Sequence, residues 1–217
     1  MNHPLAIGFP ENCFVSHVRD ASIDSLFEEE KQIVTRYARM PLKHFCMGRL
    51  ASHQCLKIMK LDQPILRSQH REPLWPEQVV GSITHSGDLA IAATAYKRDY
   101  IGLGLDCERI DRKIKPDIGR RFATLKEQDW VYSDNDLNKI NVRLLQLLSA
   151  KEAVFKAFFP IEKIFLSLLD AEINFDKDQI SGNLLKKPTK LWDLDKVFHL
   201  NQISWEDYLI SSLYLPR

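Results

Sequence analysis

Two acidic side chains in one segment have the type and spacing expected of a site for a hard divalent cation. The segment IGLGLDCE, residues 101–108, alternates like a strand, so Asp106 and Glu108 share one face about 7 Å apart. Neighbouring carboxylates repel each other, and Mg²⁺ removes that cost while leaving positions for substrate phosphates. Gly102 and Gly104 precede them on the same face and would leave room for a bulky ligand. The alternative is a plain edge strand that runs out into solvent.

A third carboxylate, Glu152, lies in LSAKEAVFKAFFP, residues 148–160, which has the pattern of a helix. Glu152 and Lys156 are four residues apart and share a helix face, with Lys151 beside them. Two ordinary roles compete here: a capping box from Ser149 to Glu152, and a surface helix pair between Glu152 and Lys156. A catalytic role for Glu152 requires that it faces the two carboxylates on the predicted strand.

Phosphate-binding groups gather before the acidic strand. His85 ends a predicted strand at a Ser-Gly turn, where an imidazole suits a phosphate oxygen and Thr84 could add a donor. The alternative is a turn histidine without a role. Six basic residues precede it: Arg36, Arg39, Lys43, Arg49, Arg67 and Arg71. Arginine offers bidentate contacts to phosphate, and Arg49 follows Gly48 in a small-residue context that is unlike a solvated helix face.

Composition excludes several classes of function. The 217 residues carry 30 Lys and Arg against 29 Asp and Glu, so the formal net charge is +1. This balance favours neither a nucleic acid partner nor a membrane surface. The chain has no apolar run of the roughly 20 residues that span a bilayer. Its N-terminus lacks a basic region typical of a signal peptide, so we expect a cytoplasmic protein without an integral membrane segment.

A zinc site at His44, Cys46, His53 and Cys55 is not expected. Positions two apart on a helix point about 200° from each other, so each His and Cys pair cannot chelate one ion together.

The chain shows the same order of elements twice, helices followed by strands. In the first half we expect helices over 22–37 and 42–59 and strands over 79–85, 89–96 and 101–108. In the second half we expect helices over 122–130 and 142–159 and strands over 171–175, 191–200 and 208–215. The pattern predicts an α+β fold of two similar halves, residues 1–104 and 105–217, with a ligand cleft between them.

Five blocks occur in one order along the chain: GRLASHQCL (48–56), REPLWP (71–76), GSITHS (81–86), GLDCE (104–108) and LSAKEAVFKAF (148–158). Together they resemble the 4′-phosphopantetheinyl transferases, most closely the enterobactin-synthase component D type within the Sfp-like group. The resemblance spans about Lys43 to Phe159. It departs at Leu148, where an aromatic residue is frequent, and at Cys107, between the two strand carboxylates.

The resemblance implies a monomer of two α+β halves related by pseudo-twofold symmetry, with coenzyme A bound between them. It implies Mg²⁺-dependent transfer of the phosphopantetheine arm from coenzyme A to a serine of an apo carrier protein. The carrier would be a peptidyl, aryl or acyl carrier, and the pathway a siderophore or other secondary-metabolite synthesis. The other product would be adenosine 3′,5′-bisphosphate.

The resemblance also implies residue roles. Three carboxylates would hold Mg²⁺ with the pyrophosphate: Asp106, Glu108 and Glu152. Glu152 would also act as base for the carrier serine, directly or through water. Two groups would bind the diphosphate: Lys156 and His85. Four residues would hold the nucleotide and its 3′-phosphate: Arg49, Arg71, Thr84 and Lys151.

Two other functions stay open at this point. The chain could be a non-catalytic module that binds coenzyme A or a carrier protein without turnover. It could also be an unrelated metal-dependent phosphohydrolase that uses the same three carboxylates and releases phosphate from coenzyme A without an acceptor.

Overall fold

The computed structural model describes residues 7–34, 39–163, 166–177, 179–186 and 192–217. It divides into two compact units. Unit 1 comprises the described residues of 10–103, which leave out 35–38, together with residues 216–217. Unit 2 comprises Ile7–Phe9 and the described residues of Gly104–Leu215. The division after Leu103 lies next to the boundary proposed from the sequence, and the pseudo-twofold relation between the halves stays a prediction.

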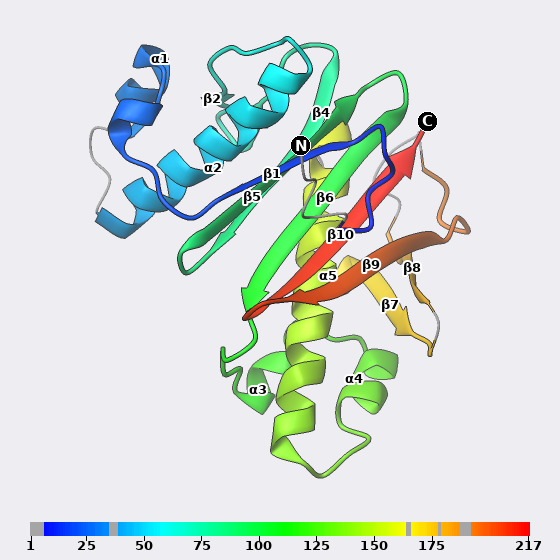
Figure 1. Cartoon of the computed structure of the whole chain (residues 1–217). Coiled ribbons are helices and arrows are strands. Elements are labelled where there is room, and N and C mark those ends of the chain that lie inside the picture. Colours follow the sequence, from blue (N-terminus) through cyan, green and yellow to red (C-terminus); the bar gives the residue numbers. More distant parts are fainter. Residues whose placement is uncertain (1–6, 35–38, 164–165, 178, 187–191) are drawn as a thin grey trace. The chain divides into compact units, whose positions relative to one another are not determined.

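Unit 1 is built on a three-stranded antiparallel sheet in the order β1-β5-β4. Its strands are β1 (Phe14–Val18), β4 (Val79–Ser86) and β5 (Leu89–Tyr96). Strands β4 and β5 form a hairpin whose turn uses Gly87 at a φ of 57°, which glycine adopts without strain. Helix α2 (Arg39–Ile58) packs along one face of this sheet (Figure 1). Pro41 lies in its first turn, where a missing N–H costs no helical hydrogen bond.

The predicted continuous helix over 22–37 is wrong within the described residues, and 35–37 lie outside them. Three short helical pieces take its place: η1 (Ile23–Ser25), α1 (Glu28–Lys31) and η2 (Gln32–Val34). Leu26 and Phe27 between the first two pieces are extended. Glu30 turns inward and accepts the Phe27 N–H at 3.1 Å, so its side chain caps a new helix start there. The sequence pattern also missed β1 and the short pair β2 (Leu66–Arg67) and β3 (Pro73–Leu74).

Unit 2 combines a long helix with a five-stranded sheet in the order β6-β10-β9-β8-β7. The strands are β6 (Tyr100–Arg109), β7 (Ala171–Phe175), β8 (Ile180–Leu184), β9 (Phe198–Trp205) and β10 (Tyr208–Pro216). The helices are α3 (Pro116–Gly119), α4 (Leu125–Val131), α5 (Leu137–Glu162) and η3 (Leu168–Asp170). The predicted strand over 191–200 is wrong over 193–197, which lie between β8 and β9, while 198–200 form the start of β9. Leu191 lies outside the described residues.

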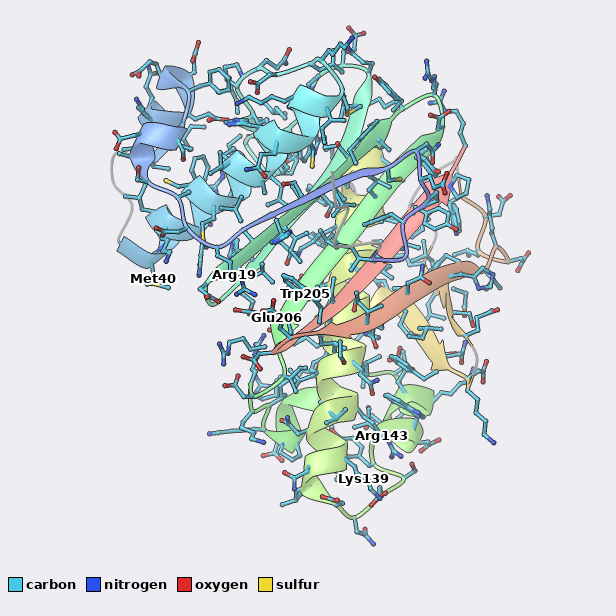
Figure 2. The ribbon with its side chains drawn as sticks, viewed as in Figure 1. Arg19, Met40, Lys139, Arg143, Trp205 and Glu206 are labelled. Atoms are coloured by element: carbon cyan, nitrogen blue, oxygen red, sulfur yellow. The ribbon has the colours of Figure 1, made fainter. Side chains whose placement is uncertain are left out.

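Helices α3 and α4 flank the first half of α5 (Figure 1). Figure 2 shows Lys139 and Arg143 on this part of α5, and both tie it to the α4 region. Arg143 donates to the Trp130 carbonyl at 3.0 Å and lies over its ring at 5.6 Å, while Lys139 pairs with Asp134 at 2.8 Å. Each unit therefore mixes helices with a sheet, which confirms the predicted α+β class. Within the part of the chain that the structure describes, no helix combines the length and apolar character needed to cross a bilayer.

The space above Gly104 is taken by the backbone of α5. A Cβ added at Gly104 would lie 1.9 Å from the Ala153 carbonyl oxygen and 3.0 Å from the Ala157 Cβ. The expectation that this glycine leaves room for a bulky ligand is therefore wrong. Its missing side chain admits a helix, which brings the residues of α5 close to β6.

Candidate active site

An acidic cluster in unit 2 is built from β6 and α5. Asp106 is 5% exposed and accepts a hydrogen bond from Lys156 Nζ at 2.7 Å. Glu108, two residues further along β6, accepts from Arg112. Glu152 lies one helical turn before Lys156 on α5. The Lys156 ammonium group thus bonds to Asp106 on β6. A surface pair between Glu152 and Lys156 on the helix alone would not include such a bond.

The three carboxylates lie within range of one another's charge. Burial raises the pKa of Glu152, Lys156 opposes that rise, and the charges of Asp106 and Glu108 raise it further. Burial likewise raises the pKa of Glu108, the Arg112 hydrogen bond opposes it, and Asp106 raises it further. Glu152 therefore lies within electrostatic range of the two strand carboxylates, which a shared role for the three requires.

The chemistry of this donor set fits a hard divalent cation, because three carboxylates offer oxygen ligands and their mutual repulsion falls when a cation enters. Their present arrangement is not an assembled metal site. Across residues 7–34, 39–163, 166–177, 179–186 and 192–217, no three His, Cys, Asp or Glu side chains are grouped to hold a metal ion. Lys156 and Arg112 instead bond to Asp106 and Glu108. The magnesium site stays a prediction.

The competing capping-box interpretation of Ser149 is wrong. Helix α5 begins at Leu137, and its N-cap is Asp136, whose side chain accepts the Asn138 N–H at 2.8 Å. Ser149 is buried in the middle of the helix and its hydroxyl lies 2.7 Å from that of Ser211 on β10.

Lys151 does not fit its predicted role as a nucleotide ligand. The residue is 1% exposed, and its ammonium group donates to the Leu168 carbonyl at 2.7 Å and the Ala171 carbonyl at 2.8 Å. It also pairs with Glu127 Oε2 at 2.7 Å. These partners account for the three N–H donors of an ammonium group. Lys151 therefore ties α5 to α4 and to the start of β7.

A cavity of about 590 Å³ in unit 1 is lined by three of the six predicted phosphate- and nucleotide-binding residues, Arg49, Arg71 and His85. Its wall includes eight residues from α2, β4 and the segment between them that contains β2 and β3: His44, Phe45, Gly48, Arg49, Arg67, Arg71, Ile83 and His85. Three arginines and two histidines on one wall suit a phosphorylated ligand.

Aromatic rings hold these cationic groups in place. The Arg49 guanidinium lies 4.5 Å from the centroid of the Phe45 ring, and that of Arg67 lies 5.5 Å from it. The exposed His85 ring stacks on His44 at 4.4 Å between centroids, and His44 Nε2 donates to the Gly87 carbonyl at 2.9 Å. The β4–β5 turn therefore fixes the histidine pair.

Two further predicted ligands differ in their placement. Arg71 is exposed on the wall of the cavity and adopts a φ of 74° in the β2–β3 turn, where its N–H donates to the Ser68 carbonyl at 3.0 Å. Thr84 is only 3% exposed and does not line the cavity. Ile83 and His85 do, so strand alternation directs the Thr84 side chain to the opposite face of β4. The predicted side-chain role of Thr84 therefore does not fit.

Two further residues line the cavity, His44 and Arg67. The sequence indicates Arg67 only as one of six basic residues near a phosphate site, and it gives His44 no role in binding phosphate. A usable signal for His44 was its spacing, because His44 and Gly48 lie four apart on α2, as do Phe45 and Arg49. Arg36 lies outside the described residues.

Comparisons with known proteins show the family of this chain. The family model of the 4'-phosphopantetheinyl transferase N-terminal domain matches residues 29–95, and that of the 4'-phosphopantetheinyl transferase superfamily matches residues 102–211. The second match covers half of the chain and contains the whole acidic cluster. The chain therefore belongs to the 4'-phosphopantetheinyl transferase superfamily.

Individual relatives match parts of the chain. 4'-Phosphopantetheinyl transferase Svp of Streptomyces mobaraensis is 31% identical over 161 residues, which are 73% of this chain and 65% of Svp. Enterobactin synthase component D of Salmonella typhimurium is 29% identical over 117 residues, 51% of this chain and 45% of that protein. The matches thus span between about half and two thirds of these relatives. The holo-[acyl-carrier-protein] synthase structure from Thermotoga maritima aligns with a TM-score of 0.42 at 17% identity, over 54% of this chain and 63% of that one.

Proposed function

We propose that the chain transfers 4′-phosphopantetheine from coenzyme A to a serine hydroxyl of an apo carrier protein in a Mg²⁺-dependent reaction. The observation that carries this proposal is the 2.7 Å bond from Lys156 to Asp106, with Glu152 one helical turn away and within electrostatic range of Asp106 and Glu108. Membership of the superfamily supports the type of reaction. In the reaction the serine oxygen forms a bond to phosphorus, the pyrophosphate P–O bond breaks, and adenosine 3′,5′-bisphosphate leaves.

In this proposal Asp106, Glu108 and Glu152 would hold the metal ion. When bound, Mg²⁺ neutralises charge on the pyrophosphate oxygens and stabilises the charge that develops as the bond breaks. Lys156 adds a fixed ammonium donor to the same oxygens. Its hydrogen bond to Asp106 keeps that ammonium at the cluster before the substrate arrives.

Glu152 would accept the proton of the carrier serine, directly or through a water molecule. Burial and the neighbouring carboxylates raise its pKa in the metal-free protein, whereas a bound Mg²⁺ would lower it, so the proposed role as base rests on the position of Glu152. Serine is a poor nucleophile while it keeps its proton, so a positioned base speeds its attack.

The nucleotide end of coenzyme A is assigned in this proposal to the cavity in unit 1. Arg49, Arg71 and His85 would contact its phosphates, and the geometry adds Arg67 and His44 to that set. His85 would serve the diphosphate, as the resemblance implies. Lys151 and Thr84 are left out, because both are buried and neither lines the cavity.

For the carrier we propose a peptidyl, aryl or acyl carrier protein of siderophore or other secondary-metabolite synthesis. The similarity to an enterobactin synthase component supports this choice, as does the Sfp-like order of the sequence blocks. We also propose that the protein acts as a cytoplasmic monomer.

The test is mass spectrometry of apo carrier proteins after incubation with the chain, coenzyme A and Mg²⁺. We expect the mass of one phosphopantetheine arm to be added to a serine, and peptidyl or aryl carriers to react faster than a fatty-acid carrier. Unmodified serines across the panel, with folded protein that binds coenzyme A, would instead indicate a non-catalytic binding module. Phosphate release from coenzyme A without an acceptor would indicate a phosphohydrolase.

A further inference from the structure

A buried carboxylate in unit 1 takes no part in the chemistry proposed so far. Glu30 on α1 is 0% exposed. Its Oε1 accepts from His53 Nε2 at 2.9 Å and from the Ile65 N–H at 2.8 Å, and it lies 3.7 Å from Arg49 Nε. Its Oε2 accepts the Phe27 N–H at 3.1 Å. One side chain thus connects α1, α2 and the segment that leads into β2.

Glu30 supplies the negative charge that a buried arginine needs. Arg49 is 5% exposed, and a buried guanidinium is costly without an opposite charge nearby. Burial alone would raise the pKa of Glu30, but the hydrogen bonds from His53 and from the Ile65 and Phe27 N–H groups outweigh it and lower that pKa. The carboxylate is therefore charged at neutral pH.

The same carboxylate acts on both cations that share the Phe45 ring in the cavity wall. Arg49 and Arg67 lie over this ring, at 4.5 and 5.5 Å from its centroid. Glu30 pairs with Arg49 across 3.7 Å. It also fixes the backbone at Ile65, two residues before Arg67.

Resting on the function proposed above, we infer that Glu30, oriented by His53, is a positioning residue that holds Arg49 and Arg67 in the geometry that binds the phosphates of the nucleotide. It acts through these two arginines and does not itself touch the ligand.

The test measures nucleotide affinity in the full chain. Calorimetry with coenzyme A and with adenosine 3′,5′-bisphosphate would compare wild type with Glu30→Gln and with Glu29→Gln. Glu29 is the exposed neighbour on the same helix, so its variant makes the same charge change away from the network. We expect the Kd of both ligands to rise about tenfold in Glu30→Gln, because Arg49 loses the charge that orients it. Glu29→Gln should bind like wild type.

A double-mutant cycle separates positioning from general loss of structure. We expect Glu30→Gln to raise Kd in the wild-type background and to have almost no further effect in a background that carries both Arg49→Gln and Arg67→Gln. An equal loss in both backgrounds would mean that Glu30 acts only on the fold and would overturn the inference. If Glu30→Gln does not fold, His53→Leu replaces it in the cycle, with the same expected non-additivity.

The outcomes also distinguish this inference from the proposed function. If the wild-type chain binds coenzyme A and modifies a carrier while Glu30→Gln binds as tightly as Glu29→Gln, the inference is overturned and the proposed function stands. If the wild-type chain binds neither ligand, both are overturned.

Discussion

Lys156 Nζ donates to Asp106 Oδ1 at 2.7 Å and joins the middle of α5 to the strand β6. This bond lies just beyond the place where Gly104 admits the backbone of Ala153. Gly104 and Asp106 lie on the same face of β6. At Gly104 this face admits the backbone of α5, and at Asp106 it contacts the Lys156 side chain of α5. A glycine therefore sets the distance at which Glu152 and Lys156 meet the carboxylates.

We predict that Gly104→Ala destabilises the protein by about 3 kcal/mol, because the new methyl group would meet the rigid backbone of α5. Urea unfolding measures the change. Gly48→Ala is the comparison: its Cβ would meet only the Ile83 Cγ2 at 2.9 Å, and we expect a loss of about 1 kcal/mol. Equal losses would contradict this explanation.

Asp106→Asn should lower the rate of carrier modification about a hundredfold while leaving the far-UV spectrum unchanged, because it removes one proposed metal ligand and the partner of Lys156. Chelation of divalent metal should stop the wild-type reaction, and added Mg²⁺ should restore it. Asp129→Asn, an exposed change on α4, serves as the control. If Asp106→Asn kept full activity, Asp106 would have no role in the proposed active site.

Glu152→Gln should abolish transfer and yet raise the melting temperature by a few degrees at neutral pH. The pKa of Glu152 is raised above its usual 4.5 in the folded state. At higher pH the ionised carboxylate is therefore less stable in the folded protein than in the unfolded chain, which lowers the free energy of unfolding. Removing that charge stabilises the fold. The gain should shrink as the pH falls through the raised pKa and vanish below the usual value, where both states are protonated.

Scanning calorimetry across this pH range measures the effect, with Glu29→Gln as the exposed control. A melting temperature of Glu152→Gln that falls at neutral pH would show that the Glu152 carboxylate stabilises the cluster.

Lys151→Met should destabilise the protein by about 3 kcal/mol, because it leaves the buried carboxylate of Glu127 without its cation. Lys139→Met on the same helix breaks the more exposed pair with Asp134 and should cost about 0.5 kcal/mol. Urea unfolding compares the two. At a temperature where Lys151→Met is folded, its Kd for coenzyme A should equal that of wild type. A higher Kd would indicate that Lys151 contacts the nucleotide after all.

Much of the candidate site follows from local spacing. Strand alternation places Asp106 and Glu108 on one face, and the four-residue helical spacing places Glu152 beside Lys156. The long helix and the β4–β5 hairpin also follow from periodicity and a glycine turn, and the order of the sequence blocks indicates the family. These features depend on bonds between near neighbours in the chain, so they can be read without the fold.

Other features depend on what packs against each element. Adjacent residues on a helix point about 100° apart, so only the packing of α5 decides that Lys151 is buried while Glu152 meets the acidic cluster. Likewise only the tertiary structure places α5 over Gly104, and only the inward turn of Glu30 explains why the first predicted helix is broken. Burial and long-range charge set the pKa of Glu152 and the position of Arg49. These quantities belong to the folded environment and are not encoded in local spacing.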